Sequence, residues 1–294
     1  MRIAAIDIGS NAARLLITEV RTAKGKKPSF SRLNKIRIPL ALGNDVFTAG
    51  RISGASESLL IETMQAFVHL IGVYQADRTA ACATAAFRAA ENGAQIRERI
   101  LSKTGIDIEI ISGDREASLI CDYHLTISPP AKATRLYVDV GGGSTEVAVY
   151  RRRSPLTVAS FHLGAILLVS NTLNPSAWNR FEDFVKTHSP SGVAREAFAT
   201  GGNIRKAHQL AGQKKNKPLS YAALKDCHDR LQPLSCQERT ERFGLKPDRA
   251  RVIVPALSIY LHFMEYAGLA EIGVPRIGLA DGIAFACYRK ALDG

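Results

Sequence analysis

Short apolar runs that end at an acidic residue and a glycine-rich turn occur twice along the chain. The first covers residues 2–7, and after its turn a second apolar stretch covers residues 14–20. The same order returns at residues 136–140 and 145–150, where Asp139 follows Asp7 by 132 residues. Apolar runs of this length, bounded by Gly, Ser and Asn, predict buried strands joined by tight turns. A repeat at this distance predicts two related domains.

Helical and strand patterns alternate through the rest of the chain. The sequence predicts helices over residues 56–74, from residue 85, and over 114–124, 203–211, 221–231, 254–266 and 279–291. It predicts further strands over residues 79–84, 106–111, 157–162 and 195–199. Strands that alternate with helices are typical of a mixed α/β sheet flanked by helices.

The stretch 126–134, which contains two prolines, is the predicted linker between the domains. We therefore expect an N-terminal domain over residues 1–127 and a C-terminal domain over residues 128–294. The final helix, at about 279–291, is expected to return and pack on the first domain. The length of 294 residues agrees with two domains.

Composition narrows the class of protein. With 46% hydrophobic and 22% charged residues, the chain is an ordinary globular one, which excludes disorder, collagen and a small disulfide scaffold. Asp7 and Arg14 interrupt the apolar N-terminus, and no stretch reaches about 18 uninterrupted apolar residues, so neither a signal peptide nor a membrane span is expected. The five cysteines contain no C-x-x-C pair, which favours a reducing cytoplasm over a disulfide framework or a zinc ribbon.

The net charge of +12 favours a polyanionic partner. Charge alone leaves nucleic acid, an anionic membrane surface and a polyphosphorylated small molecule open. No recognisable nucleic-acid reader motif is present, so charge is the only argument for nucleic acid as the primary partner.

Glycine-rich turns directly after predicted strands are the candidate phosphate sites. Several backbone N–H groups in such a turn can point the same way and hold phosphate oxygens. Asp7 and Asp139 end the two strands, where a carboxylate can hold the water shell of a phosphate-bound Mg²⁺. A plain turn is the alternative for either loop alone, but two loops and a third glycine turn in one chain favour phosphate binding. The candidate residues are Gly9, Ser10, Asn11, Gly141, Gly142, Gly143, Ser144, Thr145, Gly201 and Gly202.

Six segments, in this order and at these spacings, resemble the exopolyphosphatase/guanosine pentaphosphate phosphatase (Ppx/GppA) family. Together they extend over nearly the whole chain. They are IDIGSNAARLL from Ile6, ATAAFRAAEN from Ala83, EIISGDREASLI from Glu109, VDVGGGSTE from Val138, FHLGAILL from Phe161 and ATGGNIRKAHQL from Ala199.

The resemblance implies an α/β fold of two ribonuclease-H-like domains of the actin/Hsp70/sugar-kinase superfamily, with the active site in the cleft between them. It implies Mg²⁺-dependent hydrolysis of a terminal phosphoanhydride, with Mn²⁺ as a substitute cation, and a homodimer. Longer relatives carry additional helical domains that lengthen the polyphosphate path. Because 294 residues hold only the two core domains, we expect a preference for shorter polyphosphate chains.

The resemblance also assigns roles to residues. Glu116 matches the family's catalytic base, and an oriented carboxylate can align and deprotonate the attacking water. Arg88 and Arg14 match arginines available to phosphate, and Glu146 is the expected metal or water ligand beside Asp7 and Asp139. Two departures from the family pattern affect expected contacts. Ala12 and Ala13 stand where many members have a serine and a bulkier residue, and residues 279–282 lack the arginine that many members have there, for which Arg276 or Arg205 could substitute.

Release of orthophosphate from inorganic polyphosphate is the leading functional prediction. Guanosine pentaphosphate is the alternative substrate, and transfer of the phosphoryl group to an acceptor or ATP hydrolysis is a second alternative. A non-catalytic polyphosphate or alarmone sensor is the alternative of another class. The presence of Asp7, Glu116, Asp139 and Glu146 argues against such a sensor.

Overall fold

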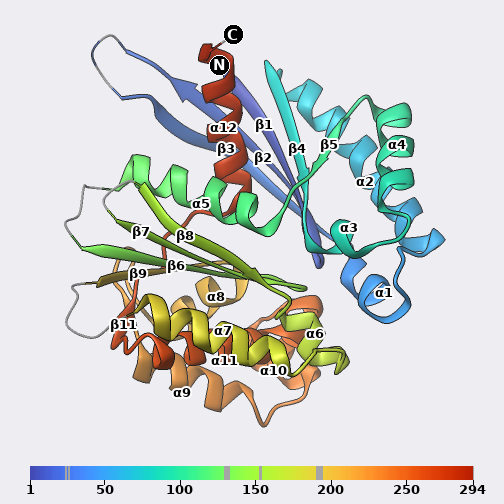
Figure 1. The fold of residues 1–294 in the computed structure, drawn as a ribbon. Coiled ribbons are helices and arrows are strands. Elements are labelled where there is room, and N and C mark those ends of the chain that lie inside the picture. Colours follow the sequence, from blue (N-terminus) through green and yellow to red (C-terminus); the bar gives the residue numbers. More distant parts are fainter. Residues whose placement is uncertain (24, 26, 129–132, 152–153, 190–194, 294) are drawn as a thin grey trace. The chain divides into compact units, whose positions relative to one another are not determined.

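The computed structural model describes residues 1–23, 25, 27–128, 133–151, 154–189 and 195–293 (Figure 1). The chain forms two compact units. Unit 1 comprises Met1–Tyr123 and Gly278–Gly294, and unit 2 comprises His124–Ile277.

Unit 1 is built on a five-stranded sheet with the order β3-β2-β1-β4-β5. The first three strands pair antiparallel, and β4 and β5 continue parallel to β1. The strands are β1 (Arg2–Ile8), β2 (Ala12–Arg21), β3 (Ser29–Pro39), β4 (Arg78–Ala83) and β5 (Ile108–Ile110).

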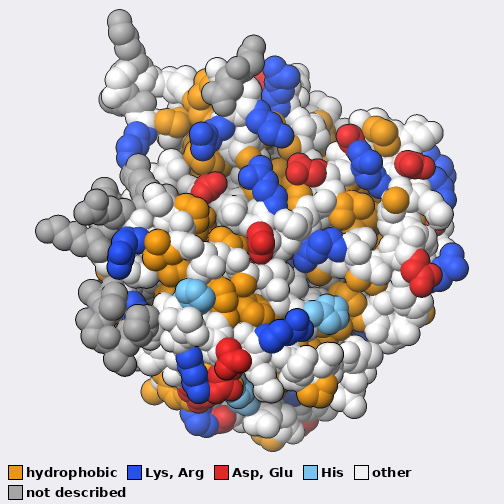
Figure 2. All heavy atoms as spheres, viewed as in Figure 1, with side chains coloured by type: hydrophobic (Ala, Val, Ile, Leu, Met, Phe, Trp, Pro, Cys, Tyr) orange, Lys and Arg blue, Asp and Glu red, His pale blue; other side chains and the backbone are white. Residues whose placement is uncertain are grey.

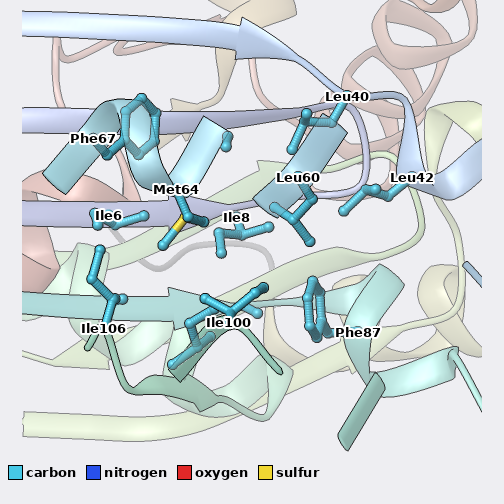
Figure 3. Packing of buried hydrophobic residues seen from close by; sticks show 14 of the residues in the cluster. Ile6, Ile8, Leu40, Leu42, Leu60, Met64, Phe67, Phe87, Ile100 and Ile106 are labelled. Atoms are coloured by element: carbon cyan, nitrogen blue, oxygen red, sulfur yellow. The ribbon is translucent and has the colours of Figure 1, made fainter. Parts of the chain in front are cut away.

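Helices cover both faces of this sheet, which is why β1 is a nearly continuous apolar run. The helices are α1 (Leu42–Ala49), α2 (Gly54–Val73), α3 (Ala85–Ala89), α4 (Gly93–Thr104), α5 (Gly113–Ile127) and α12 (Leu279–Asp293). Ile6 and Ile8 of β1 pack with Met64 and Phe67 of α2 in the core on one face (Figure 3). On the other side, α12 packs against β1, β2 and β4.

Unit 2 repeats the strand order on a smaller scale, as β8-β7-β6-β9. Its strands are β6 (Thr134–Val140), β7 (Thr145–Arg151), β8 (Ser154–Phe161) and β9 (Arg195–Thr200), and β10 (Leu219–Ser220) pairs with β11 (Glu271–Ile272) in a two-stranded sheet. The apolar helix α11 (Pro247–Tyr266) packs against β6 and five other helices. These are α6 (Ala165–Ser170), α7 (Ser176–His188), α8 (Gly202–Leu210), α9 (Tyr221–Leu231) and α10 (Cys236–Phe243).

The repeat seen in the sequence is therefore a repeat of architecture: three antiparallel strands and a fourth strand parallel to the first occur in each unit. The predicted strands and helices are all present. Sequence patterns missed the strands β3, β10 and β11 and the helices α1, α4, α6, α7 and α10. The predicted linker at 126–134 falls partly outside the described residues, and α5 extends into it as far as Ile127.

No helix in the described ranges has both the length and the apolar character needed to cross a bilayer.

Candidate active site

In unit 1, the first glycine turn places an acid and a base directly opposite each other. Asp7 of β1 and Arg14 of β2 are partners in the strand ladder, and Arg14 Nη1 lies 2.7 Å from Asp7 Oδ2. Asp7 is only 5% exposed. Gly9 N–H donates to Ala12 C=O at 3.1 Å and closes the turn. The buried carboxylate is thus neutralised by a cation of the same sheet.

In unit 2, the equivalent ladder position holds two acids. Asp139 of β6 faces Glu146 of β7, and carboxylate oxygens of the two residues lie within 4.8 Å of each other. Glu146 is 1% exposed. The Thr200 hydroxyl donates to Asp139, and the Ser160 hydroxyl donates to Glu146 Oε1 at 2.8 Å.

Two carboxylates this close repel each other when both are ionised, and burial strengthens the repulsion. A divalent cation between them removes it, and carboxylate oxygens are the ligands that Mg²⁺ prefers. The donor set of Asp139 and Glu146 therefore fits a divalent cation. Asp7, with Arg14 beside it, is in a different electrostatic setting.

The glycine-rich loop after β6 has its carbonyls bound on one side. Ala165 N–H donates to Gly141 C=O at 3.0 Å, and Ile166 N–H donates to Gly142 C=O at 2.8 Å. A trans peptide places its C=O and N–H on opposite sides, and no cis bond occurs in the described chain. The N–H groups of Gly142 and Gly143 therefore point away from α6, as an anion cradle requires.

Close contacts with the residues just before α6 also fix this loop. An added Cβ at Gly164 would lie 2.2 Å from Gly142 C=O, so only glycine allows α6 to approach the loop. The Thr145 hydroxyl donates to Leu163 C=O at 2.5 Å, and Thr145 is fully buried. The predicted phosphate ligand Thr145 thus uses its side chain to hold the loop.

Tyr260 of α11 joins the ends of β6 and β9. Its hydroxyl accepts from Val140 N–H at 3.2 Å and donates to Thr200 C=O at 2.5 Å. Burial, and next the charge of Asp139, raises the pKa of Tyr260 well above its ordinary value, so the hydroxyl keeps its proton. Gly201 has a φ of 114°, and an added Cβ there would lie 2.7 Å from the tyrosine oxygen. The third glycine turn is therefore built around this hydroxyl.

Glu116 lies in the first turn of α5, in unit 1, and is 9% exposed. The Ser112 hydroxyl accepts from Arg115 N–H at 3.2 Å and caps the helix. Arg88 Nη1 lies 3.5 Å from Glu116 Oε2 and donates to Ile111 C=O at 2.8 Å. A helix N-terminus and a guanidinium both favour the ionised carboxylate. Arg88 is thus fixed to the chain just before α5 and to Glu116 itself.

Cys82 of β4 is the ladder partner of Asp7 and is buried. Burial, with the charges of Glu109 and Asp7, raises the pKa of Cys82 to about 12. The thiol therefore stays protonated, and it offers no nucleophile beside the first glycine turn.

The predicted site residues form three groups. One group surrounds the β1–β2 turn with Asp7 and Arg14, a second is the Arg88–Glu116 pair, and a third joins the loop after β6 to the turn after β9. Sequence analysis missed Ser160, Thr200 and Tyr260. Thr200 directly precedes Gly201, which was a usable signal, but the sequence contains no local signal for Tyr260, which lies 120 residues from Val140.

Three comparisons with known proteins match the chain to the same family. The model of the Ppx/GppA phosphatase family matches residues 19–290. A protein of Mycobacterium bovis named Exopolyphosphatase 1 is 24% identical, over 100% of this chain and 90% of its own length. The crystal structure of the Ppx/GppA family member of Aquifex aeolicus is 25% identical, with a TM-score of 0.78 over 99% of this chain and 98% of that one.

The fold is also shared with a crystal structure described as an exopolyphosphatase from Cytophaga hutchinsonii, at a TM-score of 0.87, 22% identity and coverage of 99% and 98% of the two chains. The predicted fold class, an α/β fold of the actin/Hsp70/sugar-kinase superfamily with two sheets, is confirmed.

Proposed function

Because the chain belongs to the Ppx/GppA phosphatase family, it is a phosphoanhydride hydrolase, and we propose that it releases terminal orthophosphate from inorganic polyphosphate with the help of Mg²⁺. The Asp139–Glu146 pair beside the glycine-rich loop, in which Glu146 is buried and Asp139 half-buried, carries this proposal. Relatives named exopolyphosphatase, matched over the whole of this chain, support the choice of substrate. The net charge of +12 agrees with a polyanion.

Asp139 and Glu146 are the proposed holders of the cation. Asp7, the third ligand that the sequence predicts, is held in an ion pair with Arg14. A bound Mg²⁺ would neutralise phosphoryl oxygens as charge develops on them. Mn²⁺ has the same ligand preference and should substitute. The N–H groups of Gly142 and Gly143 are the proposed donors to phosphate oxygens, and their fixed orientation means that little reorganisation is needed on binding.

Glu116 is the proposed base. Water is a weak nucleophile, and a carboxylate that accepts a hydrogen bond from it orients it and takes its proton as the phosphorus–oxygen bond forms. Glu116 suits this role because its position at the helix N-terminus and the guanidinium of Arg88 both favour the ionised carboxylate. Arg88 and Arg14 are the proposed guanidinium contacts to phosphate, since each is already oriented by a carboxylate.

A panel of substrates tests the function. Phosphate release with Mg²⁺ is compared for short polyphosphate, long polyphosphate, guanosine pentaphosphate and ATP at matched concentrations of chain ends. We expect short polyphosphate to give the highest kcat/KM. Faster turnover of guanosine pentaphosphate would replace the proposed substrate with the nucleotide. Binding without turnover of any of the four would favour a polyphosphate or alarmone sensor.

Glu116→Gln tests the assignment of the base. The substitution keeps the shape of the side chain and removes its basicity, so kcat should fall by about 10²–10⁴-fold while polyphosphate binding persists. Glu62→Gln, at an exposed position of α2, is the matched control and should leave kcat unchanged. An unaltered kcat in Glu116→Gln would mean that another group activates the water.

A further inference from the structure

A groove of about 190 Å³ lies between α5 and α12 in unit 1. It is separate in sequence from all three glycine-rich turns. The lining residues recur at helical spacing, so they lie on one face of α5 and one face of α12. They are Arg115, Leu119 and Asp122 from α5, and Gly282, Phe285, Ala286, Arg289 and Lys290 from α12.

The groove has a preformed apolar floor. The two helices touch at Gly282, where an added Cβ would lie 2.3 Å from Leu119 C=O. Beside this contact, Leu119 is 4% exposed and Phe285 is 9% exposed. Phe285 lies 5.7 Å from the ring of Phe30 and 5.8 Å from that of Tyr123, centroid to centroid, so its ring is held in place from behind.

The rim of the groove is basic. Arg115, Arg289 and Lys290 are exposed and Asp122 is half-buried, which leaves two positive charges in excess. Burial raises the pKa of Asp122, and the charges of Arg115 and Arg289 oppose this rise. On the face shown in Figure 2, Lys and Arg side chains gather over the part of unit 1 that contains α12. Low-dielectric walls concentrate such a field inside a groove.

We propose that this groove binds a small organic anion in which a phosphate or phosphonate group is joined to a ring or a short apolar chain. The guanidinium and ammonium groups suit the anionic oxygens, and Leu119, Phe285 and Ala286 offer the apolar surface. The volume corresponds to about six water molecules, which limits the buried part of the ligand to that size. Polyphosphate leaves the apolar floor unused, so the combination of surfaces favours an amphiphilic anion.

The site does not depend on the proposed function, but it adjoins a helix used in that proposal. Arg115 directly precedes Glu116 at the start of α5. A ligand in the groove would contact α5 over the two turns that follow Glu116.

Calorimetric titration of the whole protein with phenylphosphonate tests the site, with inorganic phosphate and benzyl alcohol as the two halves of the probe. Phenylphosphonate should bind at least about tenfold more tightly than either half. The double variant Arg289→Glu/Lys290→Glu should lose this affinity by about tenfold or more, since charge-assisted bonds are lost. Arg51→Glu/Lys103→Glu reverses two exposed charges elsewhere in unit 1 and should bind like the parent.

Ala286→Trp provides a second variant that keeps every charge and fills the groove, so it should also abolish phenylphosphonate binding. Equal affinities for phenylphosphonate in the parent and in both groove variants would overturn the proposal, as would equal affinities for phosphate and phenylphosphonate in the parent. Polyphosphate hydrolysis, measured in the same samples, keeps the two proposals apart. The groove variants should hydrolyse polyphosphate like the parent. A parent protein that does not hydrolyse polyphosphate would contradict only the proposed function.

Discussion

At the scale of single residues, one position of the repeated unit is used in two ways. Asp7 and Asp139 occupy the same place near the end of the first strand of each sheet. The residue opposite is Arg14 in unit 1 and Glu146 in unit 2. An acid facing a base is electrostatically complete, whereas two facing acids repel each other when both are ionised, and a divalent cation between them would remove that repulsion. The substitution of one partner residue thus separates a self-neutralised turn from a candidate metal site.

This difference predicts opposite effects of Asp139→Asn with and without metal. Without metal, the variant should unfold at the same or a higher temperature than the parent, because one of two repelling charges is gone. Mn²⁺ should no longer raise the unfolding temperature of the variant. The affinity of the variant for Mn²⁺, measured by electron paramagnetic resonance, should fall by about 100-fold or more.

Asp183→Asn, at an exposed position of α7, is the matched control for that experiment and should respond to Mn²⁺ like the parent. Equal Mn²⁺ affinity in Asp139→Asn and the parent would remove Asp139 from the ligand set.

His124 predicts a pH dependence of stability. Its ring bonds to the hydroxyls of Tyr137 and Ser128, both at 2.9 Å. Burial, and then the charge of Arg135, lowers the pKa of His124 from 6.5 to about 4. The unfolded chain therefore binds the extra proton between these values, and the free energy of unfolding should rise with pH from about 4 to 6.5, by about 2–3 kcal/mol.

Urea unfolding at a series of pH values measures this slope. In His124→Gln the rise between pH 4 and 6.5 should be much smaller, while His69→Gln, at an exposed position of α2, should keep the slope of the parent. An equal slope in His124→Gln would assign the pH dependence to other groups.

At the scale of elements, α11 carries Tyr260, whose hydroxyl joins the ends of β6 and β9 in unit 2. Tyr260→Phe removes the hydroxyl that bridges Val140 and Thr200 and leaves two buried backbone groups without their partner. We expect a loss of about 1–3 kcal/mol in the free energy of unfolding. We also expect weaker Mn²⁺ binding, by about 10–100-fold, because Thr200 orients Asp139.

Tyr137→Phe separates these two effects. It removes another buried tyrosine hydroxyl of unit 2, whose partner is His124, and should lose stability without losing Mn²⁺ affinity. If both variants bind Mn²⁺ like the parent, Tyr260 stabilises the fold and has no part in arranging the acidic pair.

The elements that sequence patterns identified are those with an unambiguous period. β1 and β6 have buried residues on both faces of the strand, and most of the apolar residues of α11 are buried. β3 was missed because it is the edge strand of its sheet and most of its residues are half-buried or exposed, so its sequence lacks an apolar run. The short α6 was missed because six residues give less than two turns of pattern.

Parts of the candidate site that are local in sequence were predictable in the same way. Glycine turns and the acids before them are local, so the sequence displays them. The loop carbonyls bound by α6, and the Tyr260 bridge, depend on long-range packing that no local pattern encodes. The contrast between Asp7 and Asp139 also required the strand register, because a shift of one residue would place different partners opposite them.

At the scale of the whole molecule, the net charge of +12 should govern how fast a polyanion arrives. Attraction between unlike charges raises the association rate, and salt screens it over about 10 Å at 0.1 M ionic strength. For polyphosphate, kcat/KM should therefore fall by about tenfold between roughly 0.05 and 0.5 M salt. Saturating substrate removes the dependence on encounter, so kcat should change little over the same range.

Longer chains carry more charge and should show the steeper salt dependence, which a comparison of tripolyphosphate with a longer polyphosphate measures at fixed free Mg²⁺. An uncharged osmolyte at equal osmolality is the control and should leave kcat/KM unchanged. If kcat falls in parallel with kcat/KM, salt acts on the cation site or on the fold. The excess of basic residues would then serve solubility or another ligand, such as the anion proposed for the α5–α12 groove, and not the capture of polyphosphate.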